Sequence, residues 1–347
     1  HNKIGNVYIQ HPTLALGEGL HTIAYSYDGI SWRGLGNNIF TTAGKDAMWS
    51  GNKWIAVGSG TNTLAYSKDG FNWKGLGTSI FSTSGNGLEY NGQLYIAVGN
   101  GTEHTIGYSL NGIEWYGLGN SVFSVEANSV AYNGSKWVAV GKGDSHTIAT
   151  SDDGFVWTGQ GKSIFTDSAT GIIWSKNKWI ATGKGANSLA YSDDGVNWTG
   201  LGTAIFSVGG LSISMSPDLY VASGEGTNTL ATSIDGINWV GLGESIFSSK
   251  CLKVNYNGLR WVAAGEGTNT LAYSTDGKNW TANTKSVFST VAHSAVSNNP
   301  FGGMNLPSQL FIDEDFGIRK TYKLEFVSDS TYTNESMVAI NITSEYI

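Results

Sequence analysis

The carboxylates that could do chemistry in this chain recur inside one short pattern, Ser-x-Asp-Gly-x-x-Trp, first met at Ser26–Trp32. In chain order, the acid position of this Asp-Gly turn is held by Asp28, Asp69, Asn111, Asp153, Asp194, Asp235 and Asp276. Repeated carboxylates of this kind could bind a metal ion or sugar hydroxyls. The exchange of Asp for Asn111 leaves its repeat otherwise intact, which favours a structural role in a tight turn whose Gly adopts positive φ. We therefore predict turn residues here and no metal site.

A second recurring position holds an Asn or a His directly before a Thr or Ser. Its members are His21, Asn62, His104, His146, Asn187, Asn228 and Asn269. Amides and imidazoles can hydrogen-bond sugar hydroxyls, so these residues are candidate ligand-binding groups on one face of the protein. The alternative is that Asn and His tolerate left-handed backbone and tie the loop to its own chain. The sequence leaves both interpretations open.

Other catalytic constellations are weak. Glu18, Glu225 and Glu266 occupy equivalent loops, which is a poor match to the single acid–base pair of a glycosidase. Cys251 is the one cysteine, and the six histidines lack the spacing of metal ligands. We predict no catalytic residue, no metal and no cofactor, and a protein that is not an enzyme.

The elements that carry these residues repeat with a nearly constant period. Successive copies of the turn pattern begin 41, 42, 42, 41, 41 and 41 residues apart. In one unit we expect strands over 129–132, 137–140, 147–151 and 156–158, joined by Asn-Gly and Asp-Gly turns. Four strands per repeat of about 40 residues are typical of propellers. The prediction is an all-β, seven-bladed β-propeller with four antiparallel strands per blade.

The two ends of the repeat array overlap. Residues 290–299 resemble the first-strand segment 125–134, while the N-terminal version at 4–10 is weak. A late strand could therefore complete the first blade and close the ring. We expect a propeller over 1–299, a linker over 300–307, and a C-terminal β extension or the start of a further domain over 308–347, with strands over 309–312, 321–327 and 337–342.

The turn pattern resembles the Asp-box of bacterial-neuraminidase-repeat propellers, whose usual form has one more residue between Asp and Gly. The resemblance covers about 280 residues. It implies a propeller fold and allows several functions, sialidase among them. A sialidase would need three arginines around one carboxylate. Arg33, Arg260 and Arg319 are not placed to form such a triad, so Asp-box glycoside hydrolysis is the least favoured alternative. The fuller repeat also resembles arrays in uncharacterised structural proteins of large DNA viruses.

Composition limits the partners. The net charge of −7 and the three arginines are unsuited to nucleic acid binding. No apolar run approaches the roughly 20 residues of a membrane span. The lone cysteine favours synthesis in a reducing compartment. We expect a structural or attachment propeller on a virion surface or fibre, or otherwise extracellular, that contacts a protein partner such as a capsid or fibre component, or a glycan. A soluble lectin-like propeller is the main alternative.

Overall fold

The structure is a computed structural model that describes residues 12–283, 287–288, 290–296, 322–326 and 340–344. By its internal contacts the chain divides into two compact units. One is Pro12–Leu306, and the other combines His1–His11 with Pro307–Ile347. All regular elements in the described residues are β-strands, which confirms the predicted all-β class. No helix there is long and apolar enough to cross a membrane.

The strands of the larger unit follow one another in groups of four. The first strands, in chain order, are β4 (Ala43–Trp49), β8 (Ser84–Tyr90), β12 (Glu126–Tyr132), β16 (Ser168–Ser175), β20 (Gly209–Met215), β24 (Lys250–Tyr256) and β28 (Ala292–Val296). The second strands are β1 (Thr13–Gly17), β5 (Trp54–Ser59), β9 (Tyr95–Asn100), β13 (Trp137–Lys142), β17 (Lys178–Lys184), β21 (Tyr220–Glu225) and β25 (Trp261–Glu266).

The outer strands are shorter. The third strands are β2 (Ile23–Ser26), β6 (Leu64–Ser67), β10 (Ile106–Ser109), β14 (Ile148–Ser151), β18 (Leu189–Ser192), β22 (Leu230–Ser233) and β26 (Leu271–Ser274). The fourth strands are β3 (Arg33–Gly34), β7 (Trp73–Gly75), β11 (Tyr116–Gly117), β15 (Thr158–Gly159), β19 (Thr199–Gly200), β23 (Val240–Gly241) and β27 (Thr281–Ala282). Each strand pairs antiparallel with the next within its group.

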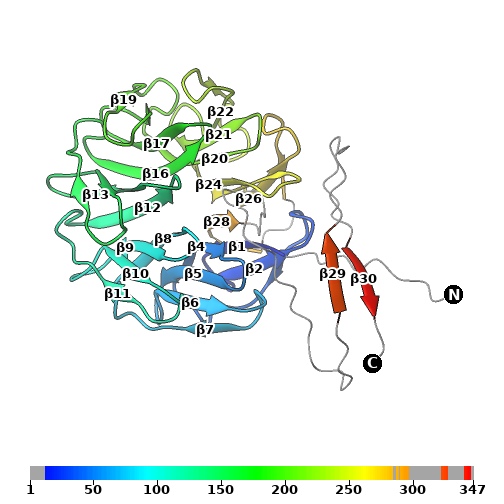
Figure 1. The fold of residues 1–347 in the computed structure, drawn as a ribbon. Helices are drawn as coiled ribbons and strands as arrows, with labels where there is room; N and C mark the ends of the chain where they lie inside the picture. Colours follow the sequence, from blue (N-terminus) through cyan, green and yellow to red (C-terminus); the bar gives the residue numbers. More distant parts are fainter. Residues whose placement is uncertain (1–11, 284–286, 289, 297–321, 327–339, 345–347) are drawn as a thin grey trace. The chain divides into compact units, whose positions relative to one another are not determined.

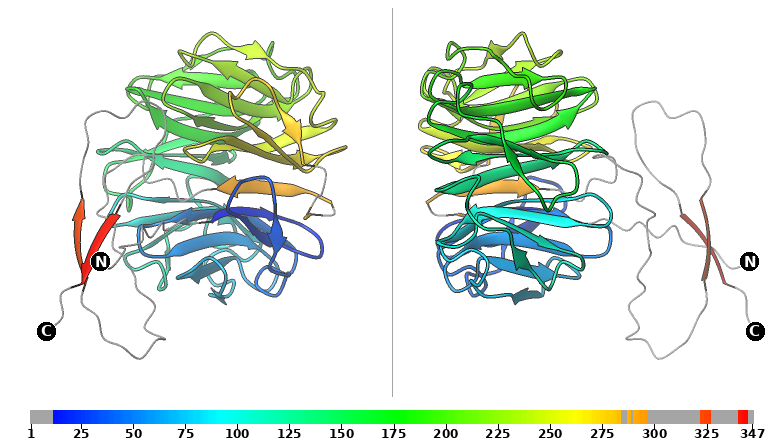
Figure 2. Two further views of the ribbon diagram at one scale, coloured as in Figure 1. Left: turned by 90° about the vertical axis from the view of Figure 1, so that its right-hand side faces the viewer. Right: turned by 60° about the vertical axis from the view of Figure 1, so that its left-hand side comes forward.

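The groups are arranged around a common centre. Figure 1 shows first strands such as β4, β16, β20 and β28 nearest the middle and fourth strands such as β7, β11 and β19 at the rim. Neighbouring groups also touch through single bridges, Ser59 with Ser84 and Glu225 with Lys250. Strand β28 pairs with β1, so a strand from late in the chain is the fourth member of the N-terminal group. In the side view of Figure 2 this orange strand lies between the yellow and the blue sheets.

The strand boundaries differ from the predicted ones in a systematic way. Strand β12 begins at Glu126 and not at residue 129, because a β-bulge between Ala127 and Ser129 absorbs one residue and lets the pairing continue. The fourth strand of the same group is Thr158–Gly159, shorter than expected. A bulge at the same place recurs in the other first strands, for example between Gly44 and Asp46.

Apolar side chains fill the space between adjacent groups. Ile96 and Val98 of β9, for example, form one buried cluster with Phe123 and with Trp137 of the next group. The recurrent phenylalanines are fully buried: Phe40, Phe81, Phe123, Phe165, Phe206, Phe247 and Phe288. Burial of a side chain of this size contributes about 1.5–3 kcal/mol. The core is thus a ring of layers between sheets, and each repeat needs its neighbours.

The smaller unit contains a two-stranded sheet, with β29 (Tyr322–Phe326) antiparallel to β30 (Ile340–Ser344). These strands fall within or near the predicted runs 321–327 and 337–342. The predicted linker 300–307 and the predicted strands 4–10 and 309–312 lie outside the described residues. The domain boundaries therefore stay a prediction.

Candidate functional site in the central cavity

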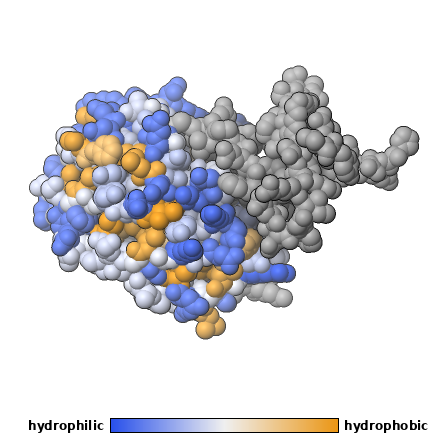
Figure 3. Space-filling model, turned by 60° about the horizontal axis from the view of Figure 1, so that its bottom comes forward, coloured by the Kyte–Doolittle hydropathy of each residue, from blue (hydrophilic) through white to orange (hydrophobic). Residues whose placement is uncertain are grey.

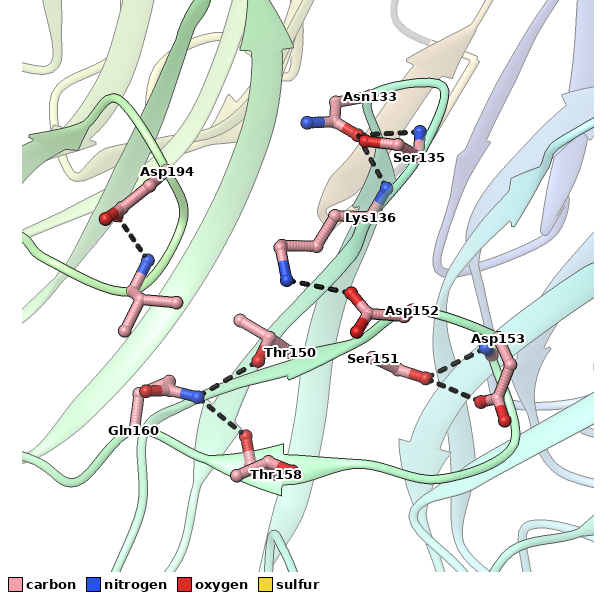
Figure 4. A network of polar contacts seen from close by, with 12 residues as sticks. Asn133, Ser135, Lys136, Thr150, Ser151, Asp152, Asp153, Thr158, Gln160 and Asp194 are labelled. Atoms are coloured by element: carbon pink, nitrogen blue, oxygen red, sulfur yellow. Dashed lines mark hydrogen bonds and ion pairs between the residues drawn. The ribbon is translucent and has the colours of Figure 1, made fainter.

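The carboxylates of the Asp-Gly turns accept hydrogen bonds from the backbone of the same turn. Asp153 Oδ1 accepts hydrogen bonds from Phe155 N at 2.8 Å and Val156 N at 2.9 Å. Ser151 Oγ also donates to Asp153 Oδ1, at 3.1 Å, and this bond is drawn in Figure 4. Gly154 has a φ of +81°, a conformation that suits glycine. The backbone hydrogen bonds, that from Val156 first, lower the pKa of Asp153. These contacts within the turn explain why an acid recurs at this position, and the explanation needs no bound ligand.

Asn111 supports the same interpretation, since its Oδ1 accepts hydrogen bonds from Ile113 N and Glu114 N, both at 2.9 Å. Every other turn acid makes the corresponding pair of backbone contacts: Asp28, Asp69, Asp194, Asp235 and Asp276. Among the described residues no group of three or more His, Cys, Asp or Glu could hold a metal ion. A neutral amide can therefore accept the same two backbone hydrogen bonds as a carboxylate in this turn.

The Asn/His position ties two loops together. Asn62 Oδ1 accepts a hydrogen bond from Gly77 N at 2.9 Å, and Asn62 Nδ2 donates to Ile39 O at 2.7 Å. A Cβ at Gly75 would lie 2.2 Å from Asn62 Oδ1, which favours the glycine found two positions after the turn Trp in six of the seven repeats; the seventh has Ala282 there. Backbone contacts of the same kind are made by His21, His104, His146, Asn187, Asn228 and Asn269. The contacts explain the pattern structurally, and ligand binding at these residues stays a prediction.

A cavity that the sequence interpretation missed lies among the first strands. It measures about 410 Å³. The bulge residue of every first strand, or its equivalent in β28, faces this central cavity. These residues are Lys45, Asn86, Asn128, Thr170, Leu211, Leu252 and His293. A bulge redirects a side chain out of the regular alternation, and bulges are frequent next to functional sites. The sequence does carry one sign of this cavity. The residue at the bulge position changes from repeat to repeat, whereas the residues on either side of it are mostly small.

Polar bulge residues link one group to the next. Asn86 Nδ2 donates a hydrogen bond of 3.0 Å to Ala127 O, and Asn128 Nδ2 donates one of 3.0 Å to Ala169 O. Thr170 Oγ1 donates to Gly210 O at 2.7 Å. Each bond runs from one first strand to the following one. The cavity wall is therefore fixed by circumferential hydrogen bonds.

Ion pairs form a belt at the ends of the second strands. Lys142 pairs with Asp167 at 2.9 Å, Lys184 with Glu225, and Lys250 with Glu266 at 3.2 Å. His293 Nε2 lies 2.7 Å from Glu18 Oε1. Burial lowers the pKa of His293, although the hydrogen bond with Glu18 raises it. The three glutamates that the sequence places in equivalent loops thus each have a basic partner.

A second charged group lies on β4, β8 and β24. Asp46 Oδ2 is 3.0 Å from Lys253 Nζ, and Asp46 Oδ1 accepts a hydrogen bond from Ser294 Oγ at 2.9 Å. Burial raises the pKa of Glu89 to about 7, and the negative charge of Asp46 adds to this shift. The inner strands therefore carry charges of both signs around the cavity.

Two of the three arginines of the alternative enzyme prediction lie within the described residues. Arg33 is exposed on the fourth strand β3, and Arg260 lies over the ring of Tyr273 with its Cζ 5.7 Å from the ring centroid. Arg319 lies outside the described residues. Cys251 is fully buried on β24.

Comparison with known proteins gives matches in structure alone: no family model matches the chain, and no curated protein matches it in sequence. A crystal structure of a nidogen/laminin complex matches with a TM-score of 0.52 and 12% identity, covering 73% of this chain and 96% of that one. YCF48 bound to D1 peptide matches with a TM-score of 0.52 and 17% identity, covering 70% and 82%. The chain has a β-propeller-like fold.

The computationally designed Ika8 protein is a further match, with a TM-score of 0.51 and 11% identity over 77% of this chain and 84% of that one. At identities this low, the likeness concerns the fold. The β-propeller-like fold places first strands around a centre, and in this chain those strands carry the variable residues of the cavity.

Proposed function

We propose that the chain is a closed seven-bladed β-propeller that acts as a non-enzymatic module and binds a partner protein at the central cavity. The blade number follows from counting each group of four strands as one blade, with β28 completing the first. The observation that carries the function is the bulge position. The scaffold positions of the repeat stay nearly constant, whereas the residues facing the cavity differ from blade to blade.

A protein partner fits the cavity wall better than a glycan does. Charged and amide side chains line much of the cavity, and the described lining residues include no Phe, Tyr or Trp, on whose faces sugar rings commonly stack. Two of the matched structures, the nidogen/laminin complex and YCF48 bound to D1 peptide, are complexes with a protein or peptide. They support the proposal by analogy of fold.

Exposed apolar side chains also occur in the Asp-Gly turn segments of separate groups of strands. Leu110, Val156 and Ile234 are each about 70% exposed, at 68%, 70% and 73%. In Figure 3 orange hydrophobic groups interrupt the hydrophilic surface of one face. Because these side chains are scattered over separate turns, they are ordinary surface residues, and the proposal rests on the cavity.

The experiment compares capture of partners by three immobilised chains: the wild type, Lys142→Glu and Lys74→Glu. Lys142 lines the cavity, and Lys74 is exposed on the fourth strand β7. We expect a partner retained by the wild type and by Lys74→Glu to be lost from Lys142→Glu. Equal retention by all three chains would place the contact elsewhere, and retention of no protein would remove the proposed function.

The non-enzymatic part and the location need their own tests. Turnover of any chromogenic glycoside by the wild-type chain, lost on substitution of cavity carboxylates, would contradict a binding module without catalysis. A virion-surface or fibre location remains the preferred setting for such a propeller. Its test is mass spectrometry of purified particles, in which absence of the chain would exclude that setting.

A further inference from the structure

The ion-pair belt around the cavity is interrupted. The equivalent positions at the ends of the second strands, or just after β1, hold Glu18, Ser59, Asn100, Lys142, Lys184, Glu225 and Glu266. All the charged members of this set are ion-paired in the described part of the chain. The two neutral members, Ser59 and Asn100, follow one another. They open a gap in the belt over two adjacent groups of strands.

A cation without an acidic partner lies at one end of this gap. Lys45, a half-buried cavity residue, donates from Nζ to Ser84 Oγ at 3.1 Å and to Asn86 Oδ1 at 2.9 Å. Both acceptors are neutral, and no carboxylate of the described residues is within ion-pair distance of Lys45. Burial lowers the pKa of Lys45, while the charges of Glu126 and Glu18 raise it. A partly desolvated ammonium of this kind is stabilised by an anion.

An acid without a basic partner lies at the other end. Glu126 is half-buried and lines the same cavity. It lies opposite Lys142 in the pairing of β12 with β13, but the ion pair of Lys142 is with Asp167, and no cation of the described residues is within ion-pair distance of Glu126. Asn86 stands between the two charges: it contacts Lys45 through Oδ1 and donates from Nδ2 to Ala127 O, directly after Glu126. Lys45, Asn86 and Glu126 thus form one arc with a positive and a negative end.

We propose that this arc is the recognition site for a short peptide segment that carries an acidic and a basic side chain. The carboxylate of the segment pairs with Lys45, its cation pairs with Glu126, and Asn86 lies beneath the intervening backbone. The inference rests on the proposed function, because it takes the central cavity as the place where a partner protein binds. The ligand completes the belt of ion pairs that the chain itself leaves open.

The test uses four fluorescent peptides of equal length, one with Glu and Lys, one with Glu alone, one with Lys alone and one with Gln at both places. Binding to the wild-type chain is measured by fluorescence anisotropy at low ionic strength. We expect the mixed peptide to bind most tightly. Lys45→Gln should weaken binding of the Glu-containing peptides about tenfold and leave the Lys peptide unchanged, and Glu126→Gln should do the reverse.

Lys136→Gln is the matched control. Lys136 is also a half-buried lysine, with 28% of its side chain exposed, but it pairs with Asp152 next to an Asp-Gly turn (Figure 4). Its substitution should not change the affinity of any peptide. Thermal unfolding of each variant shows whether the fold is intact. A double-mutant cycle gives the interaction free energy between each charged residue of the protein and the oppositely charged residue of the peptide.

Three results would overturn the inference. The first is binding of the Gln peptide as tight as that of the mixed peptide, the second is a folded Lys45→Gln chain with unchanged affinities, and the third is no binding of any peptide at millimolar concentration. If Lys142→Glu loses a captured partner while Lys45→Gln and Glu126→Gln retain it, the proposed function stands and the charged arc is not its recognition site.

Discussion

Lys253 Nζ lies 3.0 Å from Asp46 Oδ2, although 207 positions separate the two residues in the chain. Strand β28 lies between their strands, and its Ser294 donates a second hydrogen bond to the same carboxylate. Asp46 therefore joins the second group of strands to the last group and to the strand that completes the first. In the proposed closed propeller, these side chains join the two ends of the repeat array together with the pairing of β28 with β1.

Removal of β28 should open this closure. A chain that ends at residue 291 loses the partners of Leu14 and Leu16 on β1 and the hydrogen bond to Asp46. An unpaired, buried strand edge is costly and promotes aggregation. We expect the melting temperature to fall by at least about 5 °C, or the chain to aggregate. Differential scanning calorimetry measures the change.

The matched control is a chain that ends at residue 299, which keeps β28 and removes the predicted linker and extension. It should unfold as cooperatively as the full chain. If both truncations lower the melting temperature equally, the strand β28 is not what closes the ring.

The Asp-Gly turn predicts a graded response to substitution. Asp69 accepts hydrogen bonds from Phe71 N at 2.8 Å and Asn72 N at 2.7 Å. Asp69→Ala removes this acceptor and should lower the free energy of unfolding by about 1 kcal/mol, as for loss of a helix N-cap. Asp69→Asn should lose less than half of that, because Asn111 makes the same contacts naturally. Urea denaturation distinguishes the two, and equal losses would show that the negative charge matters.

Glu89 predicts a specific pH dependence of stability. Its pKa is about 7 in the folded chain and close to 4.5 in the unfolded chain, so folding favours the protonated acid. Its stabilising contribution is complete below about pH 4.5 and is lost as the pH rises through about 7. Glu89→Gln should therefore lose less stability than the wild type between about pH 5 and about pH 8. Chemical denaturation at both pH values measures this difference.

The control for Glu89 is Glu244→Gln, which changes an exposed glutamate. That variant should follow the wild-type pH profile. A wild-type profile for Glu89→Gln as well would mean that the proton of Glu89 is not linked to folding.

Cys251 should be inert in the native protein. Its side chain is fully buried, its Sγ is 3.5 Å from Ala264 O, and burial raises the pKa of the thiol. A maleimide should label Cys251 only as fast as the surrounding strands open, and at once in denaturant. Mass spectrometry measures the rate of labelling. Labelling of the folded chain as fast as that of a free thiol would contradict the burial of β24.

The repeat reveals most of the fold and little of the candidate site. The turn acids such as Asp69 and the overlap that becomes β28 follow from local pattern, because two-residue turns and strand pairing are set by nearby residues. The direction of Lys45 depends on the bulge between Gly44 and Asp46, which is a matter of register with β5. The pairing of Asp46 with Lys253 depends on the curvature of the whole ring. Neither is visible in a single repeat.

At the Asn/His position the sequence pattern is clear, but the partner of its residues is not. The sequence identified Asn62 and its equivalents as one recurring set but could not choose between ligand and backbone as their partner. The structure supplies backbone partners for them, including Gly77 N for Asn62. The residue type that recurs in every repeat therefore belongs to the scaffold, and the bulge position, which varies between repeats, faces the cavity.

Lysine acylation, followed by mass spectrometry with and without the mixed-charge peptide, tests partner binding at the central cavity most directly. Lys45, Lys142 and Lys184 line the cavity, whereas Lys68 and Lys74 are exposed away from it. The bound peptide should protect Lys45 from acylation most strongly and leave the acylation of Lys68 and Lys74 unchanged. Protection of Lys68 or Lys74 with unchanged acylation of Lys45 would contradict partner binding at the central cavity.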